Sequence, residues 1–178
     1  MQDYVVLILK KFFKNFDSNK DNFVDSTEWV KSVDVFAELM TVPGLVAIKP
    51  GGNGDITATN FVWREIKDVP EVPSPLYYNG LVYMIKNGGI ASCMNAENGK
   101  LLFRERLGAS GPYFSSPIVA NDRIYIASIN GIVTVFEAGD KLKILAQNDL
   151  DERITATPAV VGNTIYVRTA ENLYAFGE

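Results

Sequence analysis

The chain has 178 residues, of which 47% are hydrophobic and 21% charged, values that are ordinary for a globular protein. Its 17 basic and 21 acidic residues give a net charge of -4, so the sequence carries no basic field that would attract nucleic acid or an anionic membrane surface. The chain contains one cysteine and no histidine, which excludes an intrachain disulfide, a Ser-His-Asp triad, a Cys-His pair and a zinc-histidine site within it.

The N-terminal region, residues 1–41, is expected to form a helix, an acidic loop and a second helix. Apolar residues recur at helical spacing in residues 3–16 and again in residues 27–40, and the second pattern stops before Pro43. The apolar run at residues 4–9 is too short to span a bilayer. It has no basic stretch before it and no small-residue cleavage site after it, so it predicts a buried helix face rather than a signal peptide.

The acidic loop, residues 17–28, matches the twelve-residue calcium loop of an EF-hand. Calcium prefers six to eight oxygen ligands, which such a loop presents at positions 1, 3, 5, 7, 9 and 12. The predicted metal ligands are therefore the side chains of Asp17, Asn19, Asp21, Asp25 and Glu28 and, at position 7, the backbone carbonyl of Phe23. The alternative is an acidic connector between two helices that binds no metal.

Two features of this loop depart from a paired EF-hand. Asn22 stands at position 6, where glycine is usual, although asparagine tolerates the left-handed backbone conformation better than most residues. Val24 at position 8 has no second loop to pair with in this sequence. We therefore expect a weak calcium affinity, with a dissociation constant on the order of 10⁻⁴ to 10⁻³ M.

The rest of the chain, residues 42–178, carries a pattern that repeats every 41 to 42 residues. A hydroxyl residue followed by proline begins each copy and a tyrosine follows eight residues after the proline, as Ser74-Pro75 with Tyr83, Ser116-Pro117 with Tyr125, and Thr157-Pro158 with Tyr166. A turn pair lies between them, and Gly89, Gly131 or Asn172 follows six residues after the tyrosine. This period predicts four-stranded blades of a β-propeller.

Each copy divides into strands A to D, counted from the propeller axis to the rim. The predicted strands of the first copy are 75–78, 81–86, 89–95 and 100–107, and those of the second are 117–120, 123–128, 131–137 and 142–147. The third copy supplies only strands A to C, as 158–161, 164–169 and 173–176. Upstream, 44–48 and 60–67 match strands C and D of a further blade.

About three blades form an open arc, because closed propellers typically need four to eight. The arc exposes unpaired strands. We therefore expect either a C-terminal piece of a larger protein, completed by missing blades, or a chain that closes its ring by association with other chains.

The repeats themselves carry no comparable chemistry. Cys93 lies in an apolar strand and is expected to be a small buried hydrophobe, and Trp63 and Phe103 are expected to pack between blades rather than to form a cofactor floor. The glycine-rich loop 51–55 lacks the Lys-Ser/Thr ending of a phosphate-binding loop and is expected to open no helix.

These motifs, together with the turn Asn95–Lys100 followed by Phe103 and the ending Asn172–Gly177, resemble those of PQQ-binding-like β-propeller repeat proteins. These proteins have the quinoprotein alcohol dehydrogenase-like fold. Residues 45–57 and 62–64 look like the C-terminal half of bacterial members, some of which carry an EF-hand-like insertion between two strands of a blade. The resemblance implies a mainly β fold, an open-arc propeller preceded by the EF-hand, and a family with periplasmic or other extracytoplasmic members.

The resemblance identifies the fold better than an activity. In the quinoprotein dehydrogenases each blade tends to end in a Thr-Gly turn followed by tryptophan, whereas this chain has Asn98-Gly99 and Phe103. Those enzymes also use a calcium-bound quinone, an acidic base and often a vicinal disulfide, to which no residue here can be assigned. Our leading hypothesis is a non-catalytic scaffold or protein-interaction module that binds Ca²⁺ and no nucleic acid. The alternative is a fragment of a PQQ-dependent oxidoreductase.

Overall fold

The computed structural model describes residues 17, 19–21, 23–31 and 44–177. The chain divides into two compact units, Met1–Pro43 and Gly44–Glu178. The predicted domain boundary at residues 41 and 42 lies outside the described residues. In the smaller unit residues 26–31 are helical, and the remainder of the two predicted helices lies outside the described residues, so the helix-loop-helix stays a prediction.

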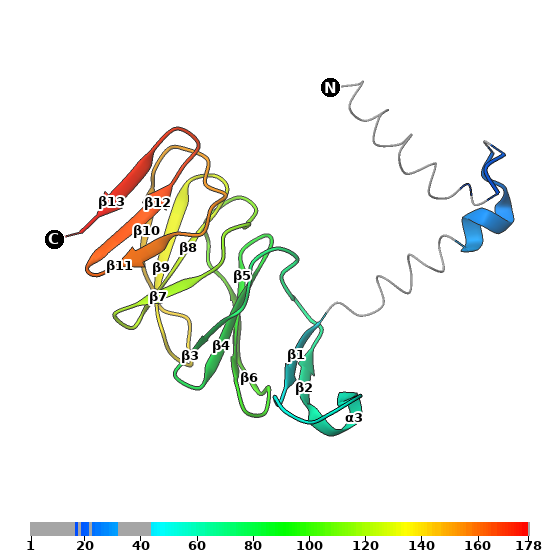
Figure 1. The fold of residues 1–178 in the computed structure, drawn as a ribbon. Coiled ribbons are helices and arrows are strands. Elements are labelled where there is room, and N and C mark those ends of the chain that lie inside the picture. The colour runs from blue at the N-terminus through cyan, green and yellow to red at the C-terminus, as the bar shows by residue number, and fades with distance from the viewer. Residues whose placement is uncertain (1–16, 18, 22, 32–43, 178) are drawn as a thin grey trace. The chain divides into compact units, whose positions relative to one another are not determined.

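The larger unit is built from four antiparallel sheets whose strands follow one another in chain order (Figure 1). The first sheet contains β1 (Leu45–Ile48) and β2 (Phe61–Glu65), separated by the short helix α3 (Thr57–Asn60), which corrects the expectation that the loop 51–55 opens no helix. The second contains β3 (Leu76–Tyr78), β4 (Leu81–Lys86), β5 (Ile90–Asn95) and β6 (Leu101–Arg106). The third contains β7 (Ile118–Ala120), β8 (Arg123–Ala127), β9 (Ile132–Glu137) and β10 (Ile144–Asp149), and the fourth β11 (Ala159–Val161), β12 (Thr164–Arg168) and β13 (Leu173–Phe176).

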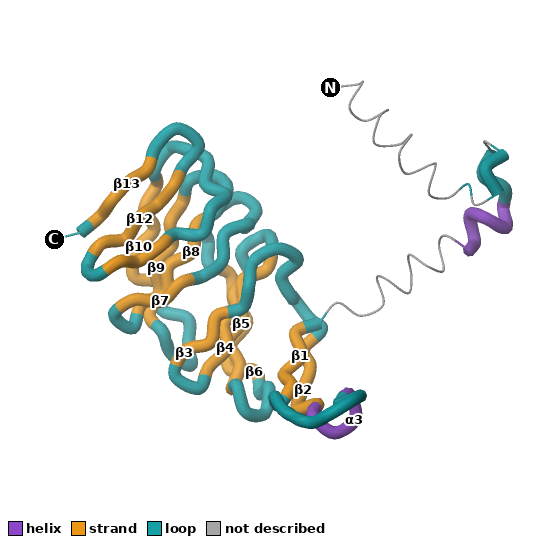
Figure 2. Tube along the Cα trace, in the orientation of Figure 1, coloured by secondary structure: helices purple, strands orange, loops and turns teal. Residues whose placement is uncertain are grey.

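This topology confirms the predicted fold class, a mainly β, open arc of propeller blades (Figure 2). The second and third sheets have all four strands, the first has only the predicted C and D strands, and the last only A to C. Most strand boundaries lie within one or two residues of the predicted ones, and β10 is displaced as a whole: it runs over Ile144–Asp149 rather than over residues 142–147. Glu137 N–H donates to the carbonyl oxygen of Lys143 (3.0 Å), so the residues before Ile144 close the turn.

Turn chemistry explains why each A strand reverses so sharply into its B strand. Asn79 and Gly80 have φ angles of 47° and 78°, and Asn121 and Asp122 have 49° and 55°. Two successive positive φ angles make the type I′ turn of two-residue hairpins, a conformation that Asn, Asp and Gly adopt at the lowest cost. The local sequence therefore sets the register Tyr78↔Leu81 and Ala120↔Arg123.

The apolar cores lie between consecutive sheets. The largest joins β4, β5 and β6 to β8 and β9, and includes Tyr83, Cys93, Phe103, Ile124 and Phe136, all at most 6% exposed. The Tyr83 ring lies 6.4 Å from the ring of Phe136 in the next sheet. Smaller clusters join the first sheet to the second and the third to the fourth. Within the described part of the chain, no helix is long and apolar enough to cross a membrane.

Candidate functional site

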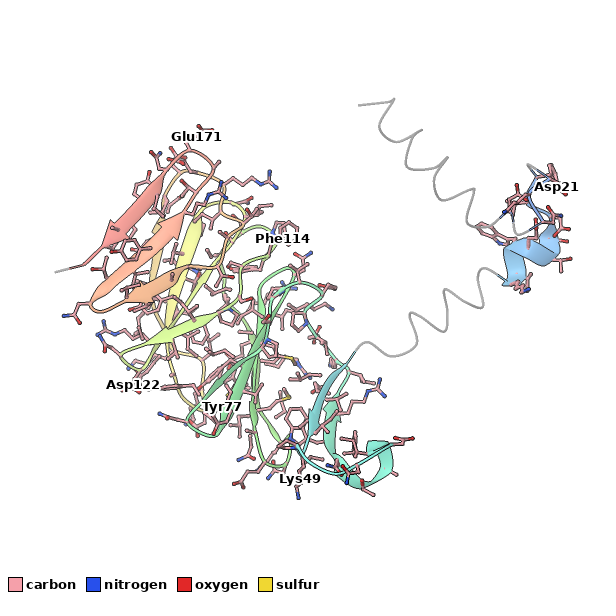
Figure 3. All side chains as sticks on the ribbon, in the orientation of Figure 1. Asp21, Lys49, Tyr77, Phe114, Asp122 and Glu171 are labelled. Carbon is pink, nitrogen blue, oxygen red and sulfur yellow. The ribbon has the colours of Figure 1, made fainter. Side chains whose placement is uncertain are left out.

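All six predicted calcium ligands are described residues of the smaller unit (Figure 3 labels Asp21). The carboxyl-bearing residues at the two ends of the loop are buried, with Asp17 9% and Glu28 7% exposed. The residues between them, Asn19, Asp21, Phe23 and Asp25, are exposed. Burial of charged carboxylates is costly unless a partner compensates it, so these two positions are the structurally constrained ones.

The oxygen atoms of the loop are turned towards the backbone of the loop itself. Asp21 N–H donates to Asp17 Oδ1 (3.1 Å) and to Asn19 Oδ1 (2.9 Å). Phe23 N–H donates to Asp21 Oδ1 (2.8 Å). Short polar side chains favour such local bonds because they satisfy backbone donors that a tight turn leaves without a partner. The sequence of the loop therefore folds it into successive tight turns.

Glu28 closes the loop from its far end. Its Oε1 accepts a hydrogen bond from Asn19 N–H (3.0 Å), nine residues earlier. Its Oε2 accepts one from Asp25 N–H (3.4 Å), while Glu28 N–H donates to Asp25 Oδ1 (2.8 Å). This reciprocal pair is a capping box, which starts the helix over residues 26–31. Glu28 thus has a structural role that the calcium motif alone did not predict.

The donor set fits calcium in kind, since it consists of carboxylate, amide and carbonyl oxygens. Lys20 has a φ of 63°, so the left-handed backbone that tightens the loop is present at position 4, while Ser18 and Asn22 lie outside the described residues. Among the described residues, no three His, Cys, Asp or Glu side chains are grouped closely enough to hold a metal ion. Each carboxylate keeps acceptor sites beyond those that its backbone hydrogen bonds occupy, and the metal site stays a prediction.

The buried polar groups between the second and third sheets hold their protons. Burial raises the pKa of the Cys93 thiol to about 12, and it also raises that of the Tyr83 hydroxyl. Tyr83 OH donates to the carbonyl oxygen of Gly139 (3.1 Å), and Cys93 Sγ lies 3.6 Å from the same oxygen. Cys93 is thus the buried hydrophobe that the sequence predicts, and Tyr83 ties one sheet to the next.

Trp63 packs between sheets, as expected from the sequence. It is 9% exposed, and its Nε1 donates to the carbonyl oxygen of Ala96 (2.8 Å) in the turn between β5 and β6. Gly99 in that turn has a φ of 70°, and a Cβ there would lie 2.8 Å from the Trp63 ring. The first sheet therefore docks on the second through a ring that fits only against glycine.

The hydroxyl residue of each repeat links consecutive sheets. Ser74 N–H donates to Ser116 Oγ (2.9 Å), and Ser116 N–H donates to Thr157 Oγ1 (2.9 Å). The spacing of the repeat is visible in the sequence, but the hydrogen bonds between its hydroxyl residues are not. The signal that could have revealed it is the hydroxyl residue before each proline.

Arg104 and Glu152, which the sequence analysis did not single out, connect different elements of the fold. Arg104 on β6 pairs with Glu65 on β2 (2.6 Å) and with Asp68 (3.5 Å), and Lys86 pairs with Asp68 (3.3 Å). Burial raises the pKa of Glu65, but hydrogen bonds from Lys67 N–H and Arg104 outweigh it and hold that pKa below its usual value. The second sheet is thereby attached to the first by charge as well as by Trp63.

Glu152 is the other such group, in the loop between β10 and β11. Its carboxylate accepts hydrogen bonds from Thr169 Oγ1 (2.5 Å), Asn172 Nδ2 (2.5 Å), Tyr174 OH (2.9 Å) and Glu171 N–H (3.1 Å). The bonds from Thr169 and Asn172 are the main reason that its pKa falls to about 2. Figure 3 labels Glu171 in the turn that this carboxylate holds, between β12 and β13.

A groove of about 310 Å³ lies between the third and fourth sheets. Its lining is mostly apolar and includes Tyr125, Val133, Val135, Leu150, Val167 and Phe176. A second hollow of about 270 Å³, which is more polar, shares Tyr125 and Phe176 with it and extends to the turn at Asn163. Neither hollow is lined by a charged residue, so both favour neutral occupants, apolar ones in the first and more polar ones in the second.

Comparison with known proteins gives the family. The family model described as outer membrane protein assembly factor BamB matches residues 54–176. The outer membrane protein assembly factor BamB of Salmonella typhimurium is 24% identical over 141 residues, and that of Escherichia coli 22%. These alignments cover 70% of this chain and 35% of each relative, so the chain spans about a third of the length of the curated relatives it matches.

The solved structures agree on the fold. The crystal structure of BamB from Moraxella catarrhalis has a TM-score of 0.54 at 17% identity, over 75% of this chain and 45% of that one. The quinohemoprotein alcohol dehydrogenase ADHIIG from Pseudomonas putida HK5 has a TM-score of 0.50 at 16% identity, over 62% and 19% of the two chains. At such identities the likeness concerns the fold alone. The predicted resemblance to PQQ-like repeat proteins is confirmed, and this chain belongs to the BamB family of PQQ-like β-propeller repeat proteins.

Proposed function

We propose that this chain is a non-catalytic scaffold segment of a propeller that binds other proteins, and that its protein takes part in assembling outer membrane proteins. The observation that carries the proposal is the match of residues 54–176 to the family model described as outer membrane protein assembly factor BamB, and the apolar outer face of the last sheet agrees with it. Leu173 is 69% exposed, Val161 66% and Tyr166 36%, whereas Tyr83, the residue equivalent to Tyr166 in the first full repeat, is 1% exposed. Large exposed apolar faces of this kind are typical of protein contact surfaces.

The chemistry of the described residues also favours a scaffold over an oxidoreductase. Tyr83 and Cys93 hold their protons because of burial, and they contact the neighbouring sheet. Glu65 and Glu152 are engaged in structural bonds and line neither of the two hollows, since Arg104 pairs with the first and the turn at Glu171 bonds to the second. The quinoprotein alternative rests on fold similarity alone, and no described residue favours it.

We further propose that residues 17–28 bind one Ca²⁺ through Asp17, Asn19, Asp21, the Phe23 carbonyl, Asp25 and Glu28. The supporting observations are the oxygen donor set and the buried carboxyl-bearing residues at both ends of the loop. The cation would supply no reaction chemistry; it would offset the negative charge that the loop concentrates in twelve residues. A weak affinity suits a compartment outside the cytoplasm. The relatives are named as assembly factors of outer membrane proteins, which agrees with such a compartment.

The scaffold proposal is tested by measuring two activities of the same preparation. The chain is titrated against a urea-unfolded outer membrane β-barrel protein, diluted into buffer and labelled for fluorescence anisotropy. It is also supplied with PQQ and Ca²⁺ and assayed for dye-linked alcohol oxidation. Saturable binding without oxidation is the expected result. PQQ-dependent turnover, or no binding at tens of micromolar protein, would overturn the proposal.

A further inference from the structure

We propose that the more polar of the two hollows between the third and fourth sheets binds a neutral phenol ring, the group that a tyrosine side chain presents. We call this hollow of about 270 Å³ the phenol site. Pockets for drug-sized ligands measure about 300–1,000 Å³, so a hollow just below that range suits a single ring. The chemistry of the ligand follows from the side chain that fills the same place between the second and third sheets.

Tyr78 fills that place between the second and third sheets. It ends β3, and its hydroxyl donates to Asp122 Oδ1 (2.6 Å) in the turn between β7 and β8 (Asp122 is labelled in Figure 3). This bond raises the pKa of the Tyr78 hydroxyl, and the Asn79 side chain, a second polar neighbour, opposes the rise. The ring packs against the core that contains Ile124 and Phe136. Tyr78 therefore has an apolar floor and two polar groups at its hydroxyl.

Ala120 stands at the equivalent position of the third sheet. Tyr78 pairs with the first residue of β4, and Ala120 pairs with the first residue of β8, so the two residues have the same place at the end of their A strands. Alanine has neither a ring nor a hydroxyl, and Ala120 lines the phenol site. The site is thus the space that a tyrosine side chain at position 120 would fill.

The polar neighbours of Tyr78 also have equivalents at the phenol site. Asn163 is the second residue of the turn between β11 and β12, as Asp122 is of the turn between β7 and β8. Asn121 is the first residue of its turn, as Asn79 is. Asn121 and Asn163 both line the site, and a side-chain amide can accept a hydrogen bond from a phenol and donate one to it. Because an amide stands where the equivalent group is a carboxylate, the site favours a neutral ligand.

The apolar floor of the phenol site repeats that of the preceding pair of sheets. Ile165 and Phe176 line the site. They pair with each other, as Ile124 and Phe136 do in the core between the second and third sheets. Tyr125 lines the site as well, and aromatic rings stabilise one another in tilted or offset contacts. The site therefore combines aromatic side chains with two amides, the surroundings that a phenol ring prefers.

The residues that follow a C strand do not take this place. In the third sheet Ala138 and Gly139 follow β9, and Ala138 N–H donates to the carbonyl oxygen of Asp122 (2.9 Å). The Gly139 carbonyl oxygen accepts a hydrogen bond from Tyr83 OH (3.1 Å). Tyr78 keeps a separate place, because it bonds to the side chain of Asp122 instead. The phenol site is therefore set by the alanine at position 120, which lies within the third sheet.

p-Cresol is the probe for this site, because it is the tyrosine side chain without its backbone. It is titrated into the full 178-residue chain labelled with ¹⁵N, and the amide resonances are recorded. We expect a dissociation constant on the order of 1 mM, since so small a ligand makes few contacts. The amide resonances of Asn121 and Asn163 should shift, and those of β4 should not. 4-Methylanisole, which has no hydroxyl to donate, is expected to bind about fivefold more weakly.

Ala120→Tyr supplies the ring from the chain itself and is expected to weaken p-cresol binding by about tenfold or more. Ala170→Tyr, at an exposed position in the turn between β12 and β13, is the matched control and should leave binding unchanged. Asn163→Leu is expected to weaken binding by about fivefold, whereas Asn163→Asp introduces the group found at Asp122 and should retain binding. Unchanged p-cresol binding by a folded Ala120→Tyr variant would overturn the inference.

The parent chain keeps the test decisive if a variant fails to fold. The absence of any resonance shift at about 10 mM p-cresol, or equal binding of 4-methylanisole, would overturn the inference. The capped tripeptide acetyl-Gly-Tyr-Gly-amide distinguishes two sources of the ring: binding equal to that of p-cresol supports a tyrosine of a polypeptide, and binding of p-cresol alone supports a small phenol. Binding of p-cresol without binding of the unfolded barrel protein would overturn the proposed function and leave this inference standing.

Discussion

At the scale of single residues, Glu28 has two roles that one substitution can separate. Glu28→Gln keeps a side-chain acceptor for the capping box but removes an anionic, bidentate ligand of the proposed calcium site. We expect calcium affinity to fall by about tenfold or more, which corresponds to about 1.4 kcal/mol, with little change in helix content. Calorimetric titration and circular dichroism of the two proteins measure these two effects.

The control for this substitution needs a carboxylate without a structural partner. Glu65→Gln is unsuitable, although its strand lies outside the loop, because Glu65 is paired with Arg104. Glu105→Gln, at an exposed position on β6, is expected to leave calcium binding unchanged. Asn22→Gly is expected to bind at least as well as the parent, since glycine adopts left-handed backbone without steric cost. If the parent binds no calcium at millimolar concentrations, the loop is an acidic connector.

Glu152 makes stability depend on acid. Its pKa is lowered from an ordinary value of 4.5 to about 2 by hydrogen bonds from Thr169, Asn172, Tyr174 and Glu171 N–H. Because the folded-state pKa is lowered, the ionised group stabilises the fold above about pH 4.5, and this contribution is lost as the pH falls towards about 2. Glu152→Gln is therefore expected to lower the free energy of unfolding at pH 7, with the difference from the parent shrinking between pH 4.5 and 2.

Urea titrations of the two proteins at several pH values measure this effect. Glu171→Gln is the matched control, since it changes an exposed carboxyl in the same turn whose backbone N–H, rather than side chain, contacts Glu152. A difference between Glu152→Gln and the parent that is constant from pH 7 to pH 2 would contradict the assignment.

At the scale of elements, the docking of β2 on the second sheet depends on Gly99. Gly99→Ala would place a Cβ 2.8 Å from the Trp63 ring at a φ of 70°. Both the contact and the left-handed backbone disfavour alanine, so the free energy of unfolding is expected to fall by about 1–3 kcal/mol. Tryptophan fluorescence during urea unfolding reports the change. Gly139→Ala has open space around the new Cβ and is expected to stay within about 0.5 kcal/mol of the parent.

The elements show how far the sequence alone predicts this structure. Strand order and blade identity follow from the repeat, because turn pairs such as Asn79-Gly80 encode the hairpins locally. The alignment of Gly131 with Asn172 is less accurate: the pairing Ile165↔Phe176 shows that the last B–C turn is one residue shorter than the turn before it. Register across that turn depends on which residues reach the core, and a period count cannot resolve this.

The contacts between sheets were the least predictable part. The hydroxyl links at Ser116 and Thr157 and the carboxylate of Glu152 join residues 17 to 42 positions apart. Serine, threonine and glutamate are common on surfaces, so their presence in a sequence carries little information about such bonds. The calcium loop is the opposite case, because all its predicted ligands lie within twelve consecutive residues and the motif can be recognised directly in the sequence.

At the scale of the whole molecule, the larger unit is a row of sheets that contact only their neighbours in the sequence. Such an arrangement distributes stability unevenly, because each sheet depends on the area it buries against the sheets beside it. The core between the second and third sheets contains ten buried residues, whereas that between the third and fourth contains four, Ala127, Val133, Ile154 and Val167. The last sheet also leaves the side chains of Leu173 and Val161 69% and 66% exposed.

The last sheet is therefore expected to open before the others. Native-state amide hydrogen exchange should show the strongest protection in β4, β5, β8 and β9, and the weakest in β11 to β13, because local opening is favoured where few apolar contacts are lost. Val167→Ala, which removes a buried side chain from the smaller core, should speed exchange in β12 and β13 while leaving β4 and β5 protected. Uniform protection across all the sheets, or equal acceleration by this substitution in every strand, would instead mean that the sheets unfold as one cooperative body.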